Sequence, residues 1–256
     1  KQFYQERSLV TSDFVLAADA SEIKQWVLDG KLAIPFVQKA RTDGYDGRGV
    51  HIVRSLSDLL DLLDVESVIE PLVDIDREIA VIVARNPQGD ISSFPVVDME
   101  FHPTANLVEY LFSPSRVSEE IQTKAIQLAE SIAKEMKIIG LLAVELFLTK
   151  DNELLINEVA PRPHNSGHHT IEANITSQYE QHLRAILGMP LGDTALIQSA
   201  AMVNLLGAPG YTGEAHYENF DECLATSGAH IHLYGKSTTK PFRKMGHATI
   251  VDKDLD

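Results

Sequence analysis

Two apolar runs around a short polar turn constrain this chain more than any other feature. The run at 141–148 carries a single acid, Glu145, and the polar turn at 149–152 leads into a second run that ends at Glu158. Two such runs separated by a short polar turn predict a β-hairpin.

The register of this hairpin decides what its acids can do. If 151–152 is a two-residue loop, Lys150 faces Glu153 across the hairpin. In the same register Glu145 faces Glu158. Opposed Cβ atoms lie about 4.5–5.5 Å apart, where like charges destabilise a sheet unless something neutralises them. Mg²⁺ is commonly held by one or two carboxylates plus substrate phosphates. The pair therefore indicates either a Mg²⁺ site or a solvated hairpin whose acids face water.

A glycine-rich segment follows a predicted strand at 33–38 and precedes another that begins at 51. Its glycines are Gly44, Gly47 and Gly49. Glycine allows backbone N–H groups to approach a ligand closely. The spacing is neither the Walker pattern nor the dinucleotide-binding pattern, so the segment is either a turn or a phosphate-binding loop. The flanking cations Lys39 and Arg48 favour phosphate.

Strands and helices alternate along the chain without a repeated βαβ spacing, which is typical of an α+β fold. We expect helices that begin at Ser21, Ser57 and Ser118, and a fourth over 172–187. Further strands are expected at 68–73, 78–84, 91–97, 200–205, 230–234 and 248–251.

Composition excludes several classes of protein. The net charge of −15 predicts no general attraction to nucleic acid or anionic membranes. The single cysteine, Cys223, excludes an intramolecular disulfide and fits a reducing compartment. We find no signal peptide and no apolar run of membrane-spanning length, and so expect a cytoplasmic protein.

Two further segments carry concentrated polar chemistry. The stretch 160–169 holds three histidines, which invite a zinc site but lack an obvious closed ligand set; with Arg162 they are better suited to hydrogen-bonding an oxyanion. The stretch 236–244 holds four cations and no acid, which indicates either a solvated turn or a phosphate pocket.

The order of these features resembles the ATP-grasp superfamily: a lysine before a glycine loop, a Glu-Pro pair, an acid that opens a strand, and two carboxylates on a hairpin. Within it, the words GYDGRG at 44–49, NEVAPRPHNSGHHT at 157–170 and FRKMGH at 242–247 resemble the N5-carboxyaminoimidazole ribonucleotide synthetase family. The resemblance runs from Lys1 to about Val251, and the family's N-terminal Rossmann-like domain is missing.

This resemblance implies an α+β ATP-grasp fold, in which two subdomains grip ATP, with a small C-terminal β-rich module. The lid subdomain with its glycine loop would span 1–68, the core subdomain with the Mg²⁺-binding hairpin 69–192, and the C-terminal module 193–256.

The resemblance also implies residue roles. Groups that bind ATP would be Lys39, Gly44, Gly47, Arg48, Gly49, Glu70, Leu72, Val73, Glu78, His102, Asn157 and Glu158. Mg²⁺ would be held by Glu145 and Glu158. Asn157 could join them only through a bulge or its backbone, because successive strand residues face opposite ways. The bicarbonate and acceptor site would use Tyr45, Asp46, Arg48, Arg162, Asn165 and His168, and the ribonucleotide phosphate would meet Lys236, Arg243 and Lys244.

The implied reaction is ATP-dependent carboxylation of 5-aminoimidazole ribonucleotide by bicarbonate through carboxyphosphate, in purine biosynthesis. The implied assembly is a homodimer whose missing N-terminal domain contributes to the site. Two alternatives stay open: another ATP-grasp ligase, such as formate-dependent glycinamide ribonucleotide transformylase, and a nucleotide-binding fragment without turnover. The Asn-Ser-Gly-His word at 165–168 favours bicarbonate over formate.

Overall fold

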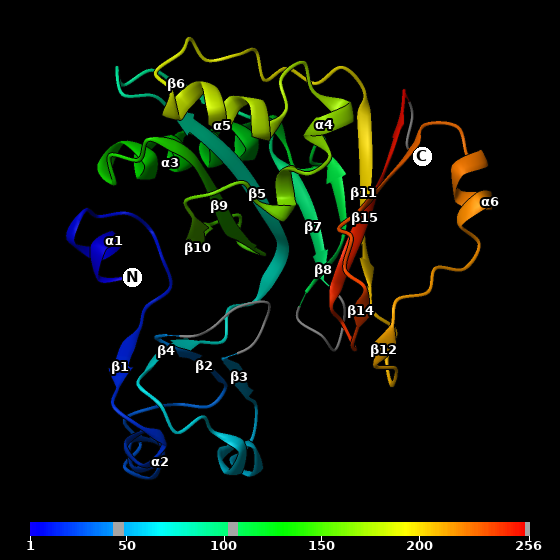
Figure 1. The fold of residues 1–256 in the computed structure, drawn as a ribbon. Helices are drawn as coiled ribbons and strands as arrows, with labels where there is room; N and C mark the ends of the chain where they lie inside the picture. Colours follow the sequence, from blue (N-terminus) through cyan, green and yellow to red (C-terminus); the bar gives the residue numbers. More distant parts are fainter. Residues whose placement is uncertain (43–48, 102–106, 254–256) are drawn as a thin grey trace.

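The computed structural model describes residues 1–42, 49–101 and 107–253. Their strands form a four-stranded sheet, a nine-stranded sheet and a two-stranded ribbon (Figure 1). All neighbouring strands in these sheets run antiparallel, which confirms the expected α+β class.

The small sheet has the order β1-β4-β2-β3. Its strands are β1 (Val15–Ala17), β4 (Ser67–Pro71), β2 (Phe36–Ala40) and β3 (Val50–Val53). Its buried face packs on helix α2 (Ala20–Leu28), mainly through Ile23 and Phe36. β4 carries this sheet beyond residue 68, where we expected the lid to end; the domain division stays a prediction.

Two helix starts in this part of the chain differ from the prediction. Asp19, not Ser21, caps α2, because its side chain accepts the Glu22 N–H at 2.9 Å. The 3₁₀ helix η1 (Leu56–Asp61) begins after Ser55, not Ser57, through a reciprocal capping box.

The large sheet has the order β10-β9-β5-β7-β8-β11-β15-β13, with β6 paired to β5. The strands are β5 (Ile75–Arg85), β6 (Ile91–Ser93), β7 (Val97–Phe101), β8 (Val108–Ser113), β9 (Gly140–Thr149), β10 (Leu154–Ala160), β11 (Ser199–Leu206), β13 (Ala229–Leu233) and β15 (Lys244–Asp252). The single strand expected at 91–97 is two strands, since Pro95 cannot donate to a ladder and the chain bends there.

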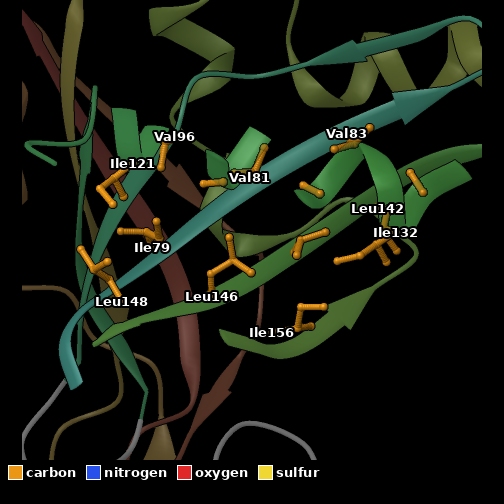
Figure 2. Close-up of a cluster of buried hydrophobic side chains, with 14 of the residues drawn as sticks. Ile79, Val81, Val83, Val96, Ile121, Ile132, Leu142, Leu146, Leu148 and Ile156 are labelled. Atoms are coloured by element: carbon orange, nitrogen blue, oxygen red, sulfur yellow. The ribbon is translucent and has the colours of Figure 1, made fainter. Parts of the chain in front are cut away.

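One face of the large sheet packs on helix α3 (Glu119–Glu135), which begins at the predicted cap Ser118. Figure 2 shows apolar side chains of β5, β9 and β10 meeting those of α3, among them Ile79, Leu146 and Ile132. These residues are fully buried. At 0.8 kcal/mol or so per buried methylene, this cluster is a major part of the stability of the fold. The opposite face of β5 and β9 carries a second apolar cluster around Ile82 and Leu141, and the acids Glu78 and Glu145 lie further along the same face.

The predicted helix over 172–187 is two helices, α4 (Thr170–Ala173) and α5 (Gln178–Ile186). Asn174 is extended and bridges to Leu196, and Ser177 then caps α5 by accepting the Glu180 N–H at 3.2 Å. Tertiary pairing therefore interrupts a sequence that is helical in tendency.

The C-terminal strands continue the large sheet, because β11 pairs with both β8 and β15. The remaining elements are α1 (Gln2–Glu6), η2 (Asn165–Gly167), β12 (Gly213–Glu214), α6 (Phe220–Ala225) and β14 (Thr238–Thr239). In Figure 1, α6 stands beside β11 and β15, away from the small sheet.

Candidate functional site

The hairpin of β9 and β10 brings Glu145 and Glu158 opposite each other, as predicted. The register near the turn was predicted wrongly: Leu154 pairs with Leu148, and the Thr149 N–H donates to the Glu153 carbonyl at 2.9 Å. Lys150 therefore lies in a three-residue loop rather than opposite Glu153.

A β-bulge restores the acid pair. The register shifts by one residue between Ile156 and Glu158, leaving Asn157 as the extra residue. The bulge lets Asn157 and Glu158 share a face of the sheet, and Oδ1 of Asn157 accepts from Nζ of Lys39 at 2.9 Å. The condition for Asn157 to join the acids is therefore met by the backbone itself.

A third acid joins this face from β5. Ala80 pairs with Glu145, and Glu78 precedes Ala80 by two residues, so the side chains of Glu78 and Glu145 point the same way. Glu145 is only 7% exposed. Its pKa is raised to about 8, first by burial and then by the negative charges of Glu158 and Glu78. Burial likewise raises the pKa of Glu78 to about 7, against the opposing charge of Lys39. This cluster of carboxylates would be stabilised by a cation.

Lys39 of the small sheet and Lys1 at the start of the chain supply opposing charges. Nζ of Lys39 lies 3.3 Å from Oε1 of Glu70, and Nζ of Lys1 lies 3.3 Å from Oε2 of the same carboxylate. Glu70 is 2% exposed, so this is a buried charge network rather than a surface pair. Lys39, Glu70 and Glu158 line a cavity of about 320 Å³ between the two sheets. The cavity brings together Lys39 and Glu158, which are 119 positions apart in the chain. Both belong to the residues that we expect to bind ATP.

The family resemblance implies an adenine hinge over 70–73, at the junction of β4 and β5. The Leu72 N–H donates to the Pro35 carbonyl at 3.3 Å, which fixes the start of this segment against β2. Val73 follows it before β5 begins at Ile75. Glu70 contributes its side chain to the charge network with Lys39.

The loop that leaves the hairpin contacts both halves of the large sheet. Nε2 of His164 lies 3.3 Å from Oε1 of Glu145. Asn165 and Asn204 of β11 exchange two amide hydrogen bonds of 2.7 and 2.9 Å. His168 stacks on His247 of β15 with ring centroids 4.6 Å apart. We call residues 162–168 the acceptor loop.

Arg162 and the basic segment complete the surroundings of the acids. Arg162 is exposed, and its positive charge, like that of Lys244, lowers the pKa of Glu145 against the effect of burial. Nζ of Lys236 donates to the Lys244 carbonyl, and Nη1 of Arg243 donates to the Thr238 carbonyl at 2.8 Å. Lys244 therefore lies within electrostatic range of the hairpin acids, and the other two cations brace its segment.

Several predicted site residues lie outside the described residues: Gly44, Tyr45, Asp46, Gly47, Arg48 and His102. Gly49 is described, and its carbonyl accepts the Ala40 N–H at 2.7 Å, which closes the base of the glycine-rich segment.

His164 is a site residue that the sequence reasoning did not assign. It was counted among three histidines as a weak zinc candidate, yet it alone of the three contacts Glu145. In the sequence, the only indication of a role was its position next to Arg162 and Pro163. The contact with Glu145 exists only in the folded chain. Within the described ranges no group of three or more His, Cys, Asp or Glu side chains is arranged to hold a metal ion. A Mg²⁺ ion here would therefore rely on two carboxylates and on phosphate oxygens.

No helix among the described residues is both long and apolar enough to cross a membrane.

Comparison with known proteins identifies two family profiles in the chain. Residues 2–179 match the ATP-grasp domain, and residues 200–256 match the phosphoribosylaminoimidazole carboxylase C-terminal domain. The chain is 39% identical to N5-carboxyaminoimidazole ribonucleotide synthase of Bacillus subtilis, over 100% of this chain and 66% of that protein.

Solved structures give the same result. The crystal structure of N5-carboxyaminoimidazole ribonucleotide synthetase from Thermotoga maritima superposes with a TM-score of 0.87 at 41% identity, covering 99% of this chain and 65% of the other. The synthase of Aspergillus clavatus in complex with ADP and 5-aminoimidazole ribonucleotide gives a TM-score of 0.88 at 29% identity, covering 99% and 67%. The chain thus spans just under two thirds of the length of the Bacillus and Thermotoga relatives.

Proposed function

This chain belongs to the N5-carboxyaminoimidazole ribonucleotide synthetase family of ATP-grasp proteins, and on that premise we propose that it is the ATP-binding and acceptor-binding part of a ligase. The full-length protein would carboxylate 5-aminoimidazole ribonucleotide with bicarbonate, at the expense of ATP, in purine biosynthesis. Cytoplasmic location remains a prediction from the sequence, and a homodimer remains a prediction from the family resemblance.

The observation that carries this proposal is the acceptor loop. It contacts Glu145 at the nucleotide end through His164, and it contacts β15, which carries Lys244, through His168. An enzyme that uses the γ-phosphoryl group of ATP to activate bicarbonate, and then transfers the carboxyl group to the amine of a phosphorylated acceptor, needs both ends within one site. The relative from Aspergillus clavatus was solved with ADP and 5-aminoimidazole ribonucleotide together.

The proposed chemistry has two steps. A bicarbonate oxygen attacks the γ-phosphorus of ATP, the bond to the β–γ bridging oxygen breaks, and ADP leaves with that electron pair. The 5-amino nitrogen then attacks the carbon of carboxyphosphate, the C–O bond to phosphate breaks, and the amine proton passes to the released phosphate. The products are N5-carboxyaminoimidazole ribonucleotide, ADP and phosphate.

The chain's own residues would supply positioning and charge, which are the main catalytic terms in phosphoryl transfer. Lys39 would meet the ATP phosphates from β2, held in place by Glu70 and Asn157. Arg162 and Asn165 would meet the bicarbonate or the carboxylated intermediate, and Asn165 is fixed by its amide pair with Asn204. Lys244 would receive the ribonucleotide phosphate.

Mg²⁺ fits the acids of the hairpin. The raised pKa of Glu145, caused in part by the charges of Glu158 and Glu78, marks a place where a cation would relieve repulsion. Glu145 and Glu158 would hold the ion, which when bound would neutralise charge on the transferring phosphoryl group.

The test is ADP release by the full-length protein with two substrate pairs. Turnover with 5-aminoimidazole ribonucleotide and bicarbonate is expected. Turnover only with glycinamide ribonucleotide and formate would contradict the proposed acceptor and favour the transformylase alternative. ADP binding without turnover of either substrate pair would mean that the protein binds nucleotide but is not a ligase.

Glu158→Gln tests the metal assignment within the same assay. We expect turnover to fall by at least ~10²-fold, the loss typical of removing one major electrostatic contributor. Glu153→Gln is the matched control, because Glu153 is an exposed acid on the same hairpin. Unchanged activity of Glu158→Gln at saturating Mg²⁺ would remove Glu158 from the metal site.

A further inference from the structure

Three imidazole rings form a continuous stack behind the acceptor loop. His168 and His247 stack with centroids 4.6 Å apart and planes at 21°, and His247 and His232 stack at 4.6 Å and 17°. The rings come from three separate segments: the acceptor loop, β15 and β13. The central ring, His247, is 2% exposed. Of the three, His168 is the one that the family resemblance places at the acceptor site; His232 and His247 have no role in the proposed chemistry.

Each ring is fixed at its edge by a different partner. Nδ1 of His168 lies 2.9 Å from the Tyr179 hydroxyl, and Nδ1 of His247 lies 3.0 Å from the Tyr234 hydroxyl. Nε2 of His232 lies 2.7 Å from Oε1 of Glu172, whose side chain is 9% exposed. Hydrogen bonds of this kind fix the ring planes, so the stack has one defined geometry rather than several.

The backbone is shaped to bring the rings together. His232 pairs with His247 across β13 and β15, and Gly246 precedes His247. A Cβ at position 246 would overlap the carbonyl oxygen of His232. Glycine at 246 therefore permits the close approach of the two strands at the point where the rings stack.

The stack joins the acceptor loop to the strand that carries the phosphate-binding cation. His168 ends the acceptor loop, which contains Arg162 and Asn165, and it stacks on His247, which lies three residues after Lys244 on β15. The positive charge of Lys244 also contributes to lowering the pKa of His168, after burial and the charge of His164, so the two lie within electrostatic range of each other. A rigid contact between the loop and β15 fixes the distance from the acceptor groups to the phosphate-binding cation.

We propose that His247 is a positioning residue: by stacking between His168 and His232 it holds the acceptor loop at a fixed distance from Lys244, and so sets how the phosphorylated acceptor sits relative to the carboxylating end. This inference rests on the proposed function for its substrate, but the contact it describes is a property of the chain. It assigns His247 no contact with substrate.

The test compares three variants of the full-length protein. His247→Ala removes the central ring, and His247→Phe keeps a stacking ring but loses the hydrogen bond with Tyr234. His230→Ala is the matched control, since His230 is an exposed histidine on the same strand as His232. Loss of the aromatic pairs predicts about a tenfold rise in the KM for 5-aminoimidazole ribonucleotide in His247→Ala. The KM for ATP should stay within about twofold, because the stack does not contact the nucleotide cavity. His247→Phe should return the acceptor KM to within about threefold of the parent, because a phenyl ring still stacks.

Hydrogen exchange of the acceptor-loop amides gives a readout that does not depend on turnover. With ADP bound, the Gly167 and His168 amides, which donate to the carbonyls of His164 and Asn165, should exchange faster in His247→Ala only. Equal rises in both KM values, a phenylalanine variant as impaired as the alanine variant, or a comparable effect of His230→Ala would each overturn the proposal. If the parent protein does not turn over 5-aminoimidazole ribonucleotide, the proposed function fails. In that case the hydrogen exchange of the Gly167 and His168 amides alone tests the positioning role, and unchanged exchange rates in His247→Ala would contradict it.

Discussion

Binding of a Mg²⁺–nucleotide complex should release close to one proton from Glu145 at pH 7. The carboxyl is 7% exposed, and its pKa is raised to about 8 by burial and by two neighbouring acids. A group with that pKa is about nine-tenths protonated at pH 7. A divalent cation ligated by the carboxylate must displace this proton. The expected release from Glu145 is therefore about 0.9 proton at pH 7, falling to about 0.1 at pH 9.

Isothermal titration calorimetry of MgADP in buffers of different ionisation enthalpy measures this release directly. The slope of the observed enthalpy against the buffer enthalpy gives the number of protons. In Glu145→Gln the number of protons released on binding should be lower by about 0.9 than in the parent, while Glu153→Gln on the hairpin turn should not change this number. For the parent, affinity should rise about tenfold per pH unit below pH 8 and then level off.

The same pKa makes an independent prediction for the ligand-free protein. The folded state keeps a proton that the unfolded state loses above pH 4.5, so the free energy of unfolding decreases as pH rises from about 4.5 to about 8. At pH 7 this penalty is of the order of 3 kcal/mol. Glu145→Gln should therefore melt at a higher temperature than the parent at pH 8 without Mg²⁺. In the calorimetric titration, a slope of observed enthalpy against buffer enthalpy that is zero at pH 7, or that is unchanged in Glu145→Gln, would refute the assignment of Glu145 as a buried, protonated ligand.

Three further predictions follow from other parts of the structure. Gly167→Ala places a Cβ into Cδ1 of Ile82, and should destabilise the protein by about 1–3 kcal/mol in denaturant titration, because this loop cannot move without breaking its contacts. Burial lowers the pKa of His247 to about 3, so below pH 6.5 the unfolded state binds a proton that the folded state does not. The free energy of unfolding should therefore fall as pH decreases, by about 2 kcal/mol at pH 5. Thermal melts of His247→Phe should depend less on acid pH than those of the parent. Replacing Arg243 or Lys244 by alanine should weaken binding of 5-aminoimidazole ribonucleotide in calorimetry and leave ADP affinity nearly intact, and a matched loss of ADP affinity would contradict that division.

Sequence patterns were sufficient for the elements whose periodicity reflects a buried face. The cap Ser118 and the apolar stripe of α3 were predictable, because one face of that helix packs on the sheet and the local sequence contains the whole pattern. The α+β class followed for a similar reason. The resemblance carried by the segments 44–49, 157–170 and 242–247 then implied residue roles that spacing alone could not predict.

Prediction failed where long-range contacts override local tendency. The sequence 172–187 is helical in composition, but Asn174 pairs with a segment that lies more than twenty residues further along the chain. The hairpin loop was predicted one residue too short, and no local signal marks the bulge at Asn157. Two errors cancelled there, and Glu145 still faces Glu158.

The sequence by itself therefore determined that two acid-bearing runs form a hairpin and which segments carry cations, since these depend on local pattern and on residue type. Only the tertiary structure decided that Glu78 joins the hairpin acids, that His164 contacts Glu145, and that rings from three segments form one stack. The physical reason is that strand pairing and loop packing place residues in contact across tens of positions in the chain, and local pattern contains no information about that separation.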